Sequence, residues 1–138
     1  MFFKKQESEV KNSFLIKICA LLIHAAKIDE IYSNSEEEII KNALIDLGAD
    51  NLNIDRIISD ATIIEENSNQ ILDFTREIKN LLHSDKVKII ESLWKIIYSS
   101  DGVDMYEANL MRRLAGLLYI DAKIMGELKD KAKRELKK

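Results

Sequence analysis

Residues 85–99 read Asp-Lys-Val-Lys-Ile-Ile-Glu-Ser-Leu-Trp-Lys-Ile-Ile-Tyr-Ser. Large apolar residues recur in this stretch three and four positions apart, at positions 89, 90, 93, 94 and 97. This period places them on one face of an α-helix, whereas a half-buried strand would alternate apolar and polar residues. The stretch therefore predicts an amphipathic helix whose apolar face, with Trp94 and Tyr98 on it, packs into a core.

The same spacing recurs along the chain and predicts an all-α fold. We expect about seven helices, over residues 5–26, 34–47, 54–65, 70–82, 85–99, 105–119 and 122–136. No segment alternates for long, and the chain has no proline, so Gly, Asn, Asp and Ser must separate the helices. Asn53, Ser84 and Asp121 are the expected N-caps, and Gly48 is the expected left-handed residue after a helix.

Length and composition limit the classes of protein to which this chain can belong. A chain of 138 residues with 46% hydrophobic and 33% charged residues is expected to form one folded domain over residues 1–138. The net charge of −3 argues against broad phosphate binding, so we expect no nucleic-acid partner. The sequence specifies neither a protein partner nor an oligomeric state.

A few residues indicate the expected compartment and whether a segment could cross a membrane. Cys19 is the single cysteine, so an internal disulfide is excluded and a cytoplasmic location is expected. The most apolar stretch, residues 14–28, is interrupted by Lys17, His24 and Lys27 and predicts a buried helix, not a transmembrane segment. Phe2-Phe3 beside two lysines leaves a peripheral membrane contact open.

The chain carries a weak internal repeat, in residues 26–36 and 98–107. In each copy an apolar helix ends near an aspartate, a short turn follows, and a glutamate opens the next helix. This pattern predicts two pseudo-repeated helical-hairpin units packed around one core, with the helix over residues 70–82 joining them.

One interpretation of the two turns is structural. Asp104 and Glu107 have the spacing of a capping box, in which an N-cap side chain and a glutamate three residues later bond each other's backbone N–H groups. Ser33 and Glu36 have the same spacing in the first copy. On this interpretation the acidic residues only cap helices.

The second interpretation is a site for a hard divalent cation. Asp101, Asp104 and Glu107 lie within one turn, and Asp29 and Glu36 occupy the corresponding turn of the first copy. Ligand sets made only of oxygen suit calcium or magnesium and not zinc. The spacing is not that of an EF-hand loop.

Two stretches carry a resemblance to a known family. Residues 73–78 read Asp-Phe-Thr-Arg-Glu-Ile, and residues 93–118 read Leu-Trp-Lys-Ile-Ile-Tyr-Ser-Ser-Asp-Gly-Val-Asp-Met-Tyr-Glu-Ala-Asn-Leu-Met-Arg-Arg-Leu-Ala-Gly-Leu-Leu. Both resemble the tellurite-resistance TerB-like family, and the resemblance extends over about residues 14–133. It implies an all-helical fold with an internal pseudo-repeat. It also implies acidic turns proposed to bind divalent metal, in bacterial proteins linked to tellurite and other stresses.

The first turn departs from the family pattern, because Asp29-Glu30 stands where the family favours Asp-Gly. We therefore favour the second turn as the cation site. An enzyme is not expected, since the chain offers no identifiable set of nucleophile, base and oxyanion donors. Two functions stay open: a divalent-cation-binding module in a stress-related role, or a structural or protein-interaction module whose acidic turns cap helices.

Overall fold

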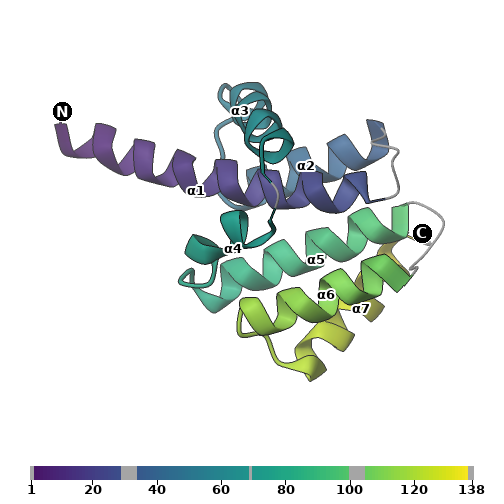
Figure 1. The fold of residues 1–138 in the computed structure, drawn as a ribbon. Coiled ribbons are helices and arrows are strands. Elements are labelled where there is room, and N and C mark those ends of the chain that lie inside the picture. The colour runs from purple at the N-terminus through teal and green to yellow at the C-terminus, as the bar shows by residue number, and fades with distance from the viewer. Residues whose placement is uncertain (1, 29–33, 69, 100–104, 137–138) are drawn as a thin grey trace.

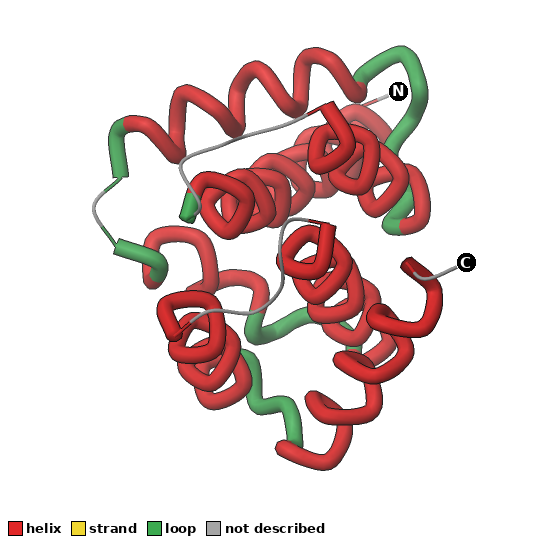
Figure 2. The backbone as a smooth tube through the Cα atoms, turned by 90° about the vertical axis from the view of Figure 1, so that its right-hand side faces the viewer, coloured by secondary structure: helices red, strands yellow, loops and turns green. Residues whose placement is uncertain are grey.

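The computed structural model describes residues 2–28, 34–68, 70–99 and 105–136. These residues form seven helices: α1 (Phe2–Lys27), α2 (Asn34–Asp46), α3 (Ile54–Glu66), α4 (Leu72–Ile78), α5 (His83–Ser99), α6 (Met105–Leu117) and α7 (Ala122–Leu136). Figure 2 shows only helices and loops over the described ranges, with no strand. The predicted all-α class is confirmed.

The helices fall into two groups joined by α4. Figure 1 shows α1, α2 and α3 in the upper half of the molecule and α5, α6 and α7 in the lower half. The most extensive backbone contacts are those of α1 with α3 and of α5 with α7. Since α1 also packs against α4 and α5, and α2 packs against α5, the two groups share one interior.

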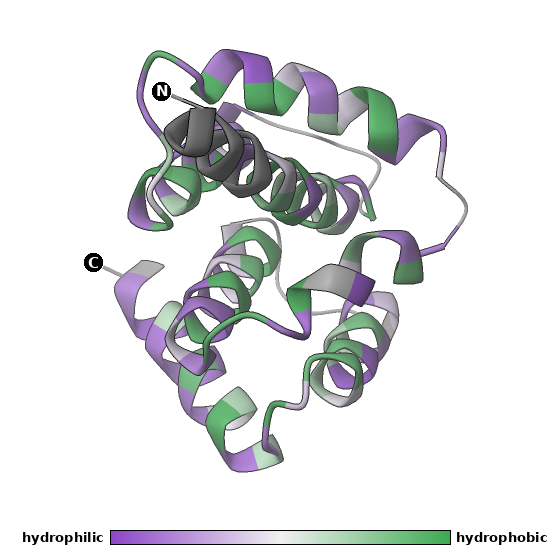
Figure 3. Ribbon diagram, turned by 90° about the vertical axis from the view of Figure 1, so that its left-hand side faces the viewer, coloured by the Kyte–Doolittle hydropathy of each residue, from purple (hydrophilic) through white to green (hydrophobic). Residues whose placement is uncertain are grey.

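The centre of α1 is the middle of the core. Residues 18–23 are each at most 2% exposed, because α2, α3, α4 and α5 all pack against this helix. A helix surrounded in this way is apolar all round, which accounts for the continuous apolar run. In Figure 3 the hydrophobic stretches lie mainly where helices face one another, and the hydrophilic stretches lie mainly outside. Among the described helices, none has both the length and the apolar character needed to cross a membrane.

Charged side chains bridge α5 and α7. Lys95 Nζ lies 3.0 Å from Glu135 Oε2 and 3.6 Å from Glu91 Oε1, and Lys131 Nζ lies 3.2 Å from Glu91 Oε1. Burial acts to lower the pKa of Lys95, but the hydrogen bonds and charges of Glu135 and Glu91 outweigh it and raise that pKa. The network supports the close packing of α7 on α5.

Two helices end in the same hydrogen-bonded motif. After α2, the N–H of Ala49 donates to the Leu44 carbonyl (2.8 Å), and Gly48 adopts a φ of 101° as predicted. After α6, the N–H of Ile120 donates to the Ala115 carbonyl (2.9 Å), and Tyr119 takes the left-handed position with a φ of 57°. Each of these helix ends is a Schellman motif. The motif after α6 ends that helix at Leu117, two residues earlier than predicted.

The joining helix α4 is shorter than predicted. It covers Leu72–Ile78, whereas the sequence pattern predicted a helix over residues 70–82. The N–H of Leu81 donates to the carbonyl of Ile78 (3.0 Å), so the chain turns tightly after the helix. This turn keeps Ile78 buried and Leu81 against the core while redirecting the backbone into α5.

The three predicted N-caps have different outcomes. Asp121 is confirmed, because its Oδ1 accepts the backbone N–H of Lys123 at 2.9 Å. Asn53 stands at the N-cap of α3 but makes no side-chain capping bond. Ser84 is wrong as a cap, because α5 already begins at His83 and the carbonyl of Leu82 accepts the first N–H groups of the helix.

The proposed repeat stays an interpretation of the sequence, and two observations favour it. Helices α2 and α6 have the same length, 13 residues. Ile40 and Ala43 of α2 are buried, and so are Met111 and Leu114, which lie 71 residues later in α6.

Candidate functional site

The helix ends that flank the two acidic turns lie at one end of the molecule. α1 and α5 both finish at the right-hand end of Figure 1, and α2 and α6 both start there. The sequence alone does not give this arrangement, since it depends on α1 and α5 pointing the same way. The first acidic turn follows α1, and the second follows α5.

Two of the predicted ligands, Glu36 and Glu107, occupy matching places at this end. Each is the third residue of its helix, Glu36 in α2 and Glu107 in α6. Glu36 is 4% exposed and Glu107 is 1% exposed. A buried carboxylate needs hydrogen bonds, a cation or a metal, and the amino end of a helix favours a negative charge. Both capping and coordination are compatible with such a placement.

The other three predicted ligands, Asp29, Asp101 and Asp104, lie outside the described residues. Within the ranges that the structure does describe, no three or more His, Cys, Asp or Glu side chains are grouped so that they could hold a metal ion. The five-residue cation site thus stays a prediction, and the structure places only Glu36 and Glu107.

A cavity of about 680 Å³ opens beside the same helix ends. Its lining comes from the end of α1, the segment before α4, and the start of α6: His24, Ile28, Gln70, Ile71, Tyr106, Asn109, Leu110 and Arg113. Ile28 is the last described residue before the first acidic turn, and Tyr106 is the second residue of α6. The cavity therefore lies beside described residues that adjoin the two turns in sequence, and both apolar and polar side chains line it.

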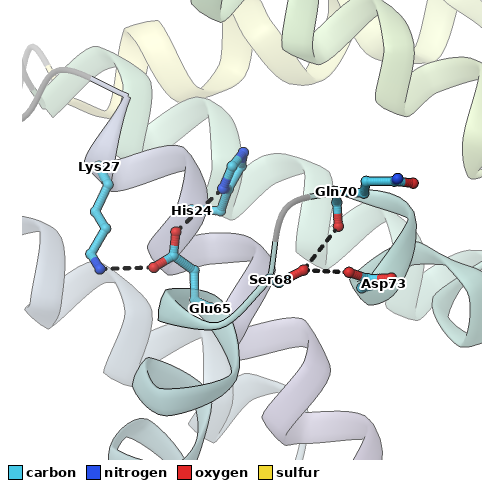
Figure 4. A network of polar contacts seen from close by, with 6 residues as sticks. All are labelled: His24, Lys27, Glu65, Ser68, Gln70 and Asp73. Atoms are coloured by element: carbon cyan, nitrogen blue, oxygen red, sulfur yellow. Dashed lines mark hydrogen bonds and ion pairs between the residues drawn. The ribbon is translucent and has the colours of Figure 1, made fainter.

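A polar network fixes one wall of this cavity (Figure 4). Glu65, near the end of α3, accepts a hydrogen bond from Lys27 Nζ at 2.7 Å and lies 3.4 Å from His24 Nδ1. Ser68 Oγ contacts the Asp73 carboxylate and the Gln70 carbonyl, which orders the approach to α4. The end of α1 is thus tied to the end of α3, and His24 is held as an interhelix contact.

Sequence spacing did not identify the polar residues of the cavity. Gln70 precedes α4, whereas Asn109 and Arg113 lie one turn apart on α6. Only the tertiary packing brings these two segments together beside the end of α1. Tyr106 is 75% exposed although it is a large aromatic residue. This exposure is a property of the tertiary structure and has no local signal in the sequence.

Cys19 contributes nothing to this site. Its side chain is fully buried in α1, as predicted, and burial raises the pKa of the thiol to about 12. The thiol is therefore neutral at physiological pH and is a poor nucleophile and a poor metal ligand.

Comparison with known families gives a match over most of the chain. A family model described as Tellurite resistance protein TerB matches residues 15–130, from the buried part of α1 into α7. No curated protein and no solved structure gives a significant match.

Proposed function

Because the chain belongs to the tellurite resistance protein TerB family, we propose that it is a non-enzymatic helical module that binds a divalent cation at its acidic turns. The proposed role is in a bacterial stress response or in tellurite resistance, and the proposed compartment is the cytoplasm. Calcium and magnesium are the proposed ions, since carboxylates and carbonyls are their preferred ligands.

One observation carries this proposal. The helix ends that flank both acidic turns lie at one end of the molecule, and a buried glutamate stands at the third position of each following helix. Glu107 would act with Asp101 and Asp104 in the second turn, which we favour. Glu36 would act with Asp29 in the first. The non-enzymatic part rests on the sequence, which offers no recognisable catalytic set.

The third position of a helix is also where a capping-box glutamate stands, and this favours a second candidate function. In that case the acidic turns only stabilise helix starts, and the protein is a structural or protein-interaction module. The two functions differ in whether a cation stabilises the fold.

Thermal melts separate the two candidates. We expect calcium or magnesium to raise the free energy of unfolding of the wild-type protein by about 2.7 kcal/mol at a hundredfold excess over the dissociation constant. Asp101→Asn should remove this gain while changing the metal-free stability little, because Asp101 precedes the capping box. Calorimetric titration with calcium, magnesium and manganese should show the same loss of binding.

Asp121→Asn is the matched control. It makes the same isosteric change at an aspartate whose capping bond Asn can also make, so it should keep the full metal effect. No metal effect in the wild-type protein would favour the capping function. Equal metal effects in wild type and Asp101→Asn would show that the ion binds elsewhere.

A further inference from the structure

A second concave surface lies on α5, α6 and α7 and shares no residue with the cavity described above. It is a groove of about 290 Å³, lined by Trp94, Ala108, Met111, Arg112, Ala115, Ala122, Met125, Gly126 and Lys129. Trp94, Met111 and Met125 are all buried and form its apolar floor.

The walls of this α6–α7 groove have helical spacing. On α6 the lining residues run from Ala108 to Ala115, and on α7 they run from Ala122 to Lys129, and both sets have the i, i+3, i+4, i+7 spacing of one helix face. Seven residues of helix rise about 10 Å, so each wall is about two turns long. A groove of this length matches two turns of a further helix.

Small side chains keep the groove open. Three of the wall residues are alanine, and a Cβ added to Gly126 would meet no atom within 4 Å. Within the described residues, α6 makes no extensive backbone contact with any other helix. Space of this kind lets another helix approach closely and insert its side chains.

An unsatisfied donor lies in the floor. The Nε1 of Trp94 is buried, and no described group accepts its hydrogen bond. A buried donor without an acceptor is unfavourable.

The rim of the groove is positively charged. Lys129 Nζ lies 5.5 Å from the centre of the Trp94 ring, and Arg112 is exposed on the facing wall. No acidic residue lines the groove, and among the described residues neither cation forms an ion pair with a carboxylate. A partner surface with acidic side chains would complement the positive charge of this rim.

We propose that the α6–α7 groove docks an amphipathic helix of a partner protein. The apolar anchors of that helix fill the groove, and its acidic residues meet Arg112 and Lys129. Methionines adapt their shape to such anchors, and Met111 and Met125 lie in the floor. The volume is at the lower limit for small-molecule pockets, and two cations are too few for a lipid-binding polybasic cluster. This docking does not depend on the proposed cation site.

The experiment uses the full chain and a synthetic helical peptide of about 16 residues without tryptophan. The peptide carries leucines at i, i+4 and i+7, flanked by glutamates, and a second peptide has lysines in place of the glutamates. Since Trp94 is the only tryptophan in the chain, its fluorescence reports occupation of the groove. Anisotropy of a dye on the peptide gives the affinity independently.

Gly126→Leu tests whether the groove is the site. The new side chain points into open space at the groove and should lower the affinity for the acidic peptide by at least about tenfold. Gly116→Leu is the control, because Gly116 is also an exposed helical glycine with open space but does not line the groove. It should leave the affinity within about twofold.

Charge reversal tests the acidic character of the partner. The double variant Arg112→Glu with Lys129→Glu should lose at least about tenfold in affinity for the acidic peptide and should bind the lysine peptide more tightly than wild type does. Circular dichroism of every variant confirms that the helices are intact.

Several outcomes would overturn the proposal. One is that the acidic peptide shows no saturable binding up to millimolar concentration. Another is that Gly126→Leu and Gly116→Leu lower the affinity for this peptide equally. A third is that wild type binds the acidic and lysine peptides with equal affinity. Cosedimentation with phosphatidylglycerol vesicles that Gly126→Leu abolishes, without peptide binding, would assign the groove to a membrane instead.

Discussion

Cys19 shows how the position of a single residue sets its chemistry. The thiol is fully buried in α1, and its pKa is raised by burial from 9.0 to about 12. The unfolded chain therefore loses the thiol proton at a lower pH than the folded chain does. The stability that this group contributes is complete below pH 9 and falls as the pH rises toward 12.

We expect the free energy of unfolding to fall between pH 9 and 12, and to fall less steeply in Cys19→Ala. Integrated over the whole pH window, the difference between the two proteins corresponds to an effect on the order of 4 kcal/mol in the free energy of unfolding. Urea denaturation at several pH values measures it. Parallel pH profiles for the two proteins would contradict the assignment, and so would rapid labelling of the native thiol by a disulfide reagent at pH 8.

At the residue scale, the sequence predicted which side chains are buried, but it did not predict which side chains line the cavity beside the acidic turns. The apolar period of α5 predicted that Trp94 is buried, and it is 5% exposed. The spacing of Glu36 and Glu107 predicted their place at helix starts. By contrast, His24 and Arg113 share a cavity through packing between distant helices, which no local pattern records.

At the element scale, a residue at an N-cap position stabilises its helix only when its side chain makes the capping hydrogen bond. Asp121 and Asn53 illustrate this. Asp121 accepts the N–H of Lys123 at the start of α7, whereas Asn53 makes no side-chain bond at the start of α3. Asp121→Ala should therefore lower the free energy of unfolding by about 0.5–2 kcal/mol. Asn53→Ala, the matched control, should cost less than Asp121→Ala. Chemical denaturation of the two variants checks this, and the reverse order would contradict the assigned caps.

The helices themselves were predictable because their apolar stripes are long and regular. Predicted and observed bounds agree to within three residues for six helices, and α4 is the exception. A seven-residue helix has too few turns for a periodic signal, and isolated helices of that length are unstable in water. Packing against α1 decides where α4 begins and ends.

At the scale of the whole molecule, the relation between the two acidic turns depends on helix direction. Both turns follow long helices, and these helices finish at the same end. The sequence predicted two units but not their orientation, because orientation is set by contacts between α1, α2 and α5. The shared location of the helix ends that flank the turns is therefore a property of the tertiary structure alone.

The division into α1–α3 and α5–α7 also has a consequence for how fast the chain folds. Most of the close backbone contacts join residues fewer than 12 positions apart, and a fold dominated by such local contacts is expected to form quickly. No prolyl bond has to isomerise, and no disulfide has to form, because the chain has no proline and one cysteine. We expect refolding from urea in stopped-flow fluorescence of Trp94 to be a single exponential on a time scale of milliseconds or less. A refolding phase of tens of seconds would mean that the two helix groups first dock incorrectly and must separate before reaching the native state.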